Sequence, residues 1–169
     1  MEAEDHPVED DPDREQRAVI AGFRGLRFVA DSSGNAFNDY QTMSVDADGL
    51  YIATSNFITG GGFDVSIYSI PKADLLLATP TVANLTRFES INAGQFGSAI
   101  QASLDFGPSD GRAALLSVSG GNTLTRTNII GAGGPGATLQ APTTIIVPNY
   151  QPGPPGDQPG GARALENVS

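Results

Sequence analysis

Apolar and polar positions alternate over short distances along most of this chain, and the apolar runs are rich in β-branched residues. Gly, Asp and Asn separate these runs, and the spacing of an amphipathic helix is nearly absent. The pattern predicts an all-β fold with strands at residues 25–30, 41–45, 50–55, 63–70, 85–90, 99–104, 112–119, 123–130 and 143–147. Only residues 71–77 look helical, because Pro71 precedes three consecutive leucines, and we expect one or two turns there.

An internal repeat narrows the choice among all-β architectures. In the first half, Asp48-Gly49 precedes a strand at 50–55, a glycine loop and a strand at 63–70; in the second half, Asp110-Gly111 precedes strands at 112–119 and 123–130 in the same order. Each copy has one further strand before it and one after it, so the sequence predicts two four-stranded antiparallel meanders. Repeats of four strands are typical of the blades of a β-propeller. The prediction is therefore about two propeller blades plus partial ones, an incomplete ring.

Both faces of the predicted strands carry apolar residues. Leu50 and Ile52 alternate with Tyr51 and Ala53, and residues 113–116 are apolar throughout. A sheet with one solvated face would alternate more regularly between apolar and polar residues. We therefore expect sheets that are covered on both sides, as blades are. The alternative that stays open is a small β-sandwich of two complete sheets with no exposed apolar flank.

Composition divides the chain into four parts. Residues 1–21 form an acidic tail, in which residues 1–17 hold eight acidic residues against two arginines, for a net charge of −6. Residues 22–147 form the β body, and residues 148–161, with five Pro and four Gly, form an extended connector. Residues 162–169 begin a further element, which we expect to be truncated.

Charge and composition exclude several classes of function. The net charge of −10 argues against binding to nucleic acid or to anionic membrane surfaces. No apolar run is long enough to insert into a membrane, and the acidic start does not resemble a signal peptide. With no cysteine, the chain forms no disulfide, thiolate nucleophile or Cys-ligated metal site. We predict no cofactor.

Catalytic chemistry has few candidates. The single histidine, His6, lies in the tail, so the β body holds no Ser-His-Asp triad and no metal site built on histidine. A carboxylate pair of the glycosidase kind stays open, with these candidates: Asp39, Asp46, Asp48, Asp64, Glu89, Asp105 and Asp110. Asp46, Asp48 and Asp110 fit a structural role better, in turns where the carboxylate bonds the backbone and the following glycine takes a positive φ. Calcium binding by Asp46 and Asp48 lacks the donor spacing of an EF-hand, and we predict no metal site.

The first repeat resembles a blade of large secreted bacterial β-propeller proteins of uncharacterised function. The motifs that carry this resemblance are Asn38-Asp39-Tyr40, Val45-Asp46-Ala47-Asp48-Gly49, Thr54-Ser55-Asn56-Phe57 and Pro71-Lys72-Ala73-Asp74-Leu75. The resemblance covers roughly residues 35–169 and weakens after Gln101, and Gln41 stands where the family often has Pro. It implies a blade architecture and an extracellular or cell-surface location.

These observations predict a non-catalytic propeller segment that binds protein or carbohydrate or acts as a scaffold. The expected ligand-binding residues are Asn38, Asp39 and Tyr40, which join an aromatic ring to amide and acid groups at the start of an inner strand. The alternative function is a fragment of a sialidase-like glycoside hydrolase. Since a propeller ring has at least four blades, two blades leave open faces, and we also expect self-association through them.

Overall fold

The computed structural model describes residues 19–20, 23–149, 156–157 and 163–165, and it confirms an all-β fold built from antiparallel sheets. Four consecutive strands form the first sheet, in the order β3 (Ala36–Val45), β4 (Gly49–Ile58), β5 (Phe63–Pro71) and β6 (Thr86–Ile91). Each strand pairs with the next in the chain. The first predicted meander is therefore present with all four of its strands.

The second sheet repeats this arrangement. It contains β7 (Ser98–Ala102), β8 (Arg112–Gly120), β9 (Thr123–Ile130), and then β10 (Thr138–Leu139) and β11 (Thr143–Ile146), which both pair with β9. Strands β10 and β11 lie one after the other along the same edge of β9. The backbone amide of Gln140, between them, continues the ladder by donating to the carbonyl of Asn128 at 2.9 Å. Pro142, which has no amide hydrogen, interrupts this fourth strand.

The remaining elements are short. Helix α1 (Lys72–Leu75) lies within residues 71–77, where one or two helical turns were predicted, while α2 (Ala93–Phe96) and β10 were not expected from the sequence. Two small hairpins pair β1 (Val19–Ile20) with β2 (Phe23–Arg24) and β12 (Gly156–Asp157) with β13 (Arg163–Leu165). Most of the predicted tail, connector and terminal element lies outside the described residues.

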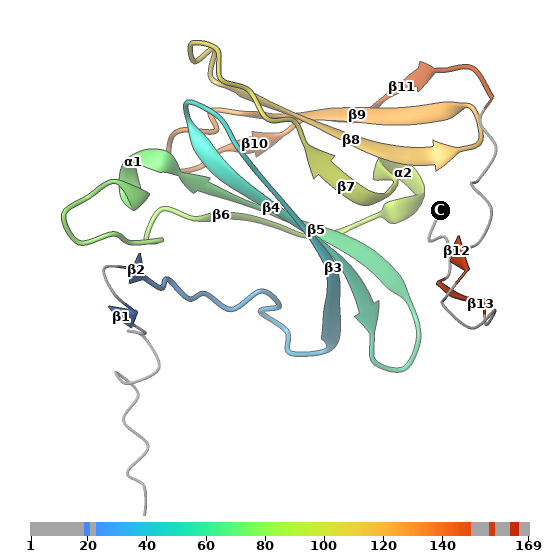
Figure 1. Cartoon of the computed structure of the whole chain (residues 1–169), viewed down its shortest axis with the longest axis horizontal. Coiled ribbons are helices and arrows are strands. Elements are labelled where there is room, and N and C mark those ends of the chain that lie inside the picture. Colours follow the sequence, from blue (N-terminus) through green and yellow to red (C-terminus); the bar gives the residue numbers. More distant parts are fainter. Residues whose placement is uncertain (1–18, 21–22, 150–155, 158–162, 166–169) are drawn as a thin grey trace, which may run out of the picture.

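The two larger sheets pack against each other around one core. Strand β7 contacts β3, β4 and β5, and the Thr42 hydroxyl on β3 donates to the carbonyl of Ile100 on β7. The residues buried between the sheets include Tyr51, Ala53, Val65, Ile67, Ile100, Ala113, Leu115 and Ile129. Figure 1 shows the second sheet above the first, with the β-structure strongly curled into a half-barrel.

Bulges in the edge strands contribute to this curl. Pairing shifts register at residues 39–42 of β3, at the end of β6 and at residues 98–101 of β7. At these three places Tyr40, Ser90 and Ala99 have φ of 53°, 55° and 50°. A bulge places one extra residue in one strand and increases the local twist, so these positions bend the edges of both sheets.

Residues 25–30 do not form the predicted strand. Residues 25–35, here called the strap, instead cross the outer face of the first sheet, the face turned away from the second sheet (Figure 1). The Phe28 ring packs on Tyr68 of β5 with centroids 5.1 Å apart, and the Tyr68 hydroxyl donates to the carbonyl of Ala30. The first sheet is therefore covered on both faces, as its apolar pattern predicted, but one cover is an irregular segment.

The Asp-Gly turns are structural, as predicted for Asp46 and Asp110. Asp46 Oδ1 accepts from the amides of Asp48 at 2.7 Å and Gly49 at 2.8 Å, and Asp110 Oδ1 accepts from the amide of Arg112 at 3.0 Å. Asp48 differs, because its carboxylate accepts from the Ser109 hydroxyl at 2.7 Å and so joins the two repeats.

Glycine serves different purposes in these two turns. Gly111 has the expected positive φ of 73°, whereas Gly49 is not among the residues with positive φ. A Cβ at Gly49 would lie 2.9 Å from the Tyr51 hydroxyl and 3.0 Å from the carbonyl of Ile70. Gly49 is therefore present because neighbouring groups approach it closely.

No helix in the described part of the chain has the length and apolar character that a membrane crossing requires.

Candidate functional site

Polar side chains gather where the strap meets the first sheet. Asp31 begins a tight turn of the strap: its Oδ1 accepts from the amide and hydroxyl of Ser33 at 2.9 and 2.7 Å, and its Oδ2 accepts from the amide of Ala36 at 2.7 Å. Glu89 on β6 accepts from the amide of Ser32 at 3.2 Å and from its hydroxyl at 2.8 Å. These contacts fasten the strap to the edge of the sheet.

A cavity of about 150 Å³ lies between the strap and the sheet. Its lining residues are Asp31, Ser33, Asn35, Ala36, Asn56, Ile58, Asp64, Ser66, Glu89 and Ser90. Three carboxylates, two amides and three hydroxyls thus face one small space, and no basic residue lines it. Such a surface offers many hydrogen-bond acceptors and a negative potential.

Asn56 organises the sheet side of the cavity. Its side chain is 4% exposed; Nδ2 donates to Asp64 at 2.7 Å and to the Ser66 hydroxyl at 2.8 Å. Its Oδ1 accepts from Asn38 Nδ2 at 2.6 Å and from the Thr54 hydroxyl at 2.8 Å. The polar groups at the base of the cavity are therefore fixed in place by one buried amide.

Hydrogen bonding also sets the charge state of the strap. The hydroxyl of Ser33, followed by the backbone amide of Ala36, lowers the pKa of Asp31 from its ordinary value to about 2. Both donors favour the ionised carboxylate. Asp31 is therefore an anion at all ordinary pH values, which suits an anchor and excludes it as a general acid near neutral pH.

The three predicted ligand-binding residues are not gathered into one site. They lie within β3 and not before it, and alternation along the strand separates Asn38, which contacts Asn56 beside the cavity, from Asp39. Asp39 accepts from the amide of Tyr40 at 2.7 Å, and Tyr40, in the bulge, is 50% exposed. Neither Asp39 nor Tyr40 lines the cavity.

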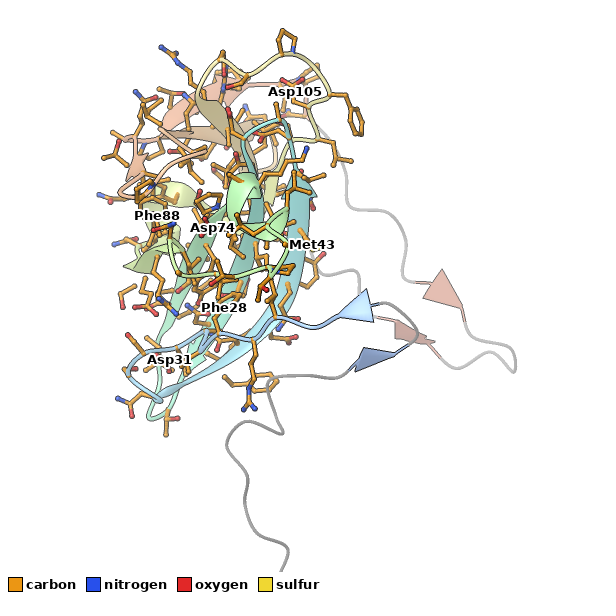
Figure 2. All side chains as sticks on the ribbon, turned by 90° about the vertical axis from the view of Figure 1, so that its left-hand side faces the viewer. Phe28, Asp31, Met43, Asp74, Phe88 and Asp105 are labelled. Atoms are coloured by element: carbon orange, nitrogen blue, oxygen red, sulfur yellow. The ribbon has the colours of Figure 1, made fainter. Side chains whose placement is uncertain are left out.

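Most of the predicted carboxylate candidates, Asp39 included, lie away from the cavity. Asp46, Asp48 and Asp110 belong to the Asp-Gly turns, and Asp105 accepts from the amide of Gly107 at 2.7 Å within a loop. Figure 2 shows Asp105 at the opposite end of the molecule from Asp31 and the strap. Only two candidates, Asp64 and Glu89, face the same cavity.

Metal chemistry and histidine chemistry have no support among the described residues. No group of three or more His, Asp or Glu side chains in this part of the chain is arranged to hold a metal ion. His6 lies outside the described residues. Among the described residues that line the cavity, the groups suited to acid–base chemistry are carboxylates.

Sequence reasoning did not identify the strap side of this cavity. The sequence predicts a turn at Asp31-Ser32-Ser33-Gly34-Asn35, but a turn signal does not indicate that these residues face a sheet. Asn56, Asp64 and Ser66 are polar residues in two largely apolar strands, at positions that alternation places on one face. These interruptions are the pattern from which a polar patch on that face was predictable.

Comparison of the chain with known protein families, curated proteins and solved structures found no match. The resemblance to propeller proteins is therefore a prediction that rests on the residues quoted for it.

Proposed function

We propose that this chain is a non-catalytic segment of a secreted or cell-surface bacterial β-propeller protein, and that it binds protein or carbohydrate or serves as a scaffold. The observation that carries this proposal is the occurrence of two consecutive four-stranded meanders that share one core. Their first strands, β3 and β7, lie against each other, and the Asp48–Ser109 bond joins their corresponding turns. Successive four-stranded sheets with neighbouring first strands are what the radial arrangement of propeller blades around a channel requires.

An exposed apolar flank favours a propeller segment over a closed sandwich. Leu116 and Val118 on β8 and Ile145 on β11 point away from the first sheet and are 38%, 41% and 38% exposed. A complete two-sheet sandwich would have solvated outer faces with polar residues. The strap side of the first sheet, with its polar cavity, supplies a surface for a ligand.

The bonding of the cavity carboxylates supports a non-catalytic role. Asp31 and Glu89 accept from strap donors, and Asp64 accepts from Asn56. These carboxylates thereby hold the strap and the sheet in place. A glycosidase needs one carboxyl group with a raised pKa, and Asp31, whose pKa is lowered, does not fit that role.

The alternative, a fragment of a sialidase-like glycoside hydrolase, draws on one observation, that Asp64 and Glu89 line the same cavity. The deciding experiment incubates the chain with fluorogenic sialosides and a panel of aryl glycosides. We expect no turnover above buffer. Turnover that disappears in the double variant Asp64→Asn/Glu89→Gln would establish the hydrolase and overturn the proposal.

Binding is measured separately on a glycan array. Asn35 is exposed and lines the cavity, so Asn35→Tyr places a ring at its mouth. Asn122→Tyr, at an exposed position in the turn between β8 and β9, is the matched control. We expect any glycan signal to be lost in Asn35→Tyr and kept in Asn122→Tyr. A signal that survives both substitutions would place carbohydrate binding elsewhere.

A further inference from the structure

The outer face of the second sheet, the one turned away from the core, has a composition unlike the rest of the chain. Val118, Leu124 and Ile145 form one row across β8, β9 and β11, and Leu116 lies beside Arg126 in the next row. Arg112, the first residue of β8, lies on the same face. No acidic residue projects from the described strands on this face, although the chain has a net charge of −10.

The two arginines of this face are available to a partner. Arg112 and Arg126 are exposed, and within the described residues neither guanidinium takes part in an ion pair or a side-chain hydrogen bond. A face that combines half-exposed aliphatic side chains with free guanidinium groups fits an acidic surface that also carries apolar side chains.

The strap side of the first sheet is such a surface. Met43 of β3 and Val29 of the strap are each 67% exposed, and Leu26 is 41% exposed. Beside them the cavity presents Asp31, Asp64 and Glu89 without a lining base. Two arginines belong to this side, and both are engaged. Arg27 of the strap has an interaction within the chain, and Arg87 donates to the carbonyl of Val29 at 3.5 Å and lies 5.9 Å from the centre of the Phe28 ring.

We infer that a second copy of this chain docks there: the outer face of the second sheet of one copy packs on the strap side of the first sheet of the next. The argument is complementarity of charge and of apolar surface between two described faces of one chain. The inference deepens the proposed function and rests on its propeller-type arrangement, because it names a second copy as the protein that the strap side binds. In a ring that copy covers the cavity, so glycan binding there is open only to separate copies.

This contact is heterologous, so it leaves an open face on each copy until the copies form a ring. A propeller ring has about four to eight blades, and each copy supplies two, which predicts closed rings of about two to four copies. A ring would leave no outer face of a second sheet exposed.

The experiment measures mass by light scattering coupled to size exclusion, with the full chain. We expect a wild-type mass of about two to four times the 17.4 kDa of one chain. The double variant Leu116→Asp/Arg126→Glu and the variant Met43→Asp should each run as monomers, with far-UV circular dichroism unchanged from the wild type. Phe57→Ser, at a 51% exposed aromatic on the other face of the first sheet, is the control that should stay assembled.

Mixing the two disabled variants separates a head-to-tail contact from a symmetric one. Each variant keeps one intact face, so the mixture should form a one-to-one complex of about twice the single-chain mass. If Met43→Asp stays assembled, or if Phe57→Ser dissociates, the inferred contact is wrong. A wild-type monomer would overturn the inference and leave the glycan and hydrolysis results to judge the proposed function by themselves.

Discussion

Replacing Asp46 with alanine removes one carboxylate oxygen that serves three donors in the first Asp-Gly turn. Oδ1 accepts from the amides of Asp48 and Gly49 at 2.7 and 2.8 Å and from the Tyr51 hydroxyl at 2.9 Å. Asp46 is 8% exposed and Tyr51 is 1% exposed, so solvent cannot replace the lost acceptor at the tyrosine. Burial and the neighbouring Asp46 carboxylate raise the pKa of Tyr51, which keeps the hydroxyl protonated as a donor.

The magnitude follows from what each variant leaves unpaired. A hydrogen bond to a charged group contributes about 1.5–3 kcal/mol, and an unpaired buried donor costs about 1–3 kcal/mol. We expect Asp46→Ala to lower the free energy of unfolding by about 3–4 kcal/mol, since it leaves the Tyr51 hydroxyl and two amides without their acceptor. Tyr51→Phe leaves two donors on the carboxylate and should cost about 1–2 kcal/mol.

The assay is urea unfolding followed by far-UV circular dichroism, because the chain has no tryptophan. The double variant Asp46→Ala/Tyr51→Phe should cost less than the sum of the two single variants by about 1–2 kcal/mol. Asp110→Ala, in the corresponding exposed turn of the second repeat with one amide bond, is the matched control and should cost about 1 kcal/mol or less. Equal losses for Asp46→Ala and Asp110→Ala, or strict additivity in the cycle, would refute this reasoning.

Three further predictions use other positions. Gly97→Ala should lower the free energy of unfolding by about 3 kcal/mol, because φ is +79° and a Cβ would lie 2.2 Å from the Ser117 hydroxyl. Its control is Gly60→Ala, at φ +88° in open space, which should cost about 1 kcal/mol in the same urea assay. Since the pKa of Asp31 is lowered, its carboxylate stabilises the fold at pH values above 3.8, its pKa in the unfolded chain, and this contribution is lost as the pH falls toward about 2. The difference in melting temperature between wild type and Asp31→Asn should therefore close in acid. A constant difference would contradict this prediction. Burial raises the pKa of Tyr68 above its ordinary value of 10.0, so the buried neutral hydroxyl favours the folded state at pH values below 10.0 and this contribution is lost as the pH rises further. Tyr68→Phe should therefore flatten the loss of stability that melts show between about pH 8 and 11. An unchanged slope would argue against the assignment.

The strap shows why a correct pattern gave a wrong element. Within residues 25–30, Phe28 and Ala30 are partly covered while Leu26 and Val29 are exposed, so part of the alternation that suggested a strand is present. Periodicity reports which side of an extended segment is buried, and it does not report whether the backbone pairs with a neighbour. The strap buries one side by crossing the strands, and it makes no ladder with them.

The repeat was predictable for a different reason. Asp46 and Asp110 act through bonds to amides two or three residues away, so their turns depend on local sequence only. The meanders between those turns follow from short connections, which favour pairing of consecutive strands. The contact of the strap with the sheet, in contrast, joins Ser32 to Glu89 across 57 positions, and no local rule predicts which distant polar groups meet.

The two outer faces of this molecule differ in a way that bears on how copies associate. The strap covers Tyr68, which is fully buried, and it satisfies the tyrosine hydroxyl with the carbonyl of Ala30. On the second sheet, Leu116 and Val118 have no comparable cover among the described residues. A covered acidic face and an uncovered basic one complement each other, whereas pairing two uncovered faces would bring Arg112 and Arg126 of one copy toward those of the other. Like charges in a contact cost free energy unless each is paired. The asymmetry therefore favours association of unlike faces over a symmetric pair.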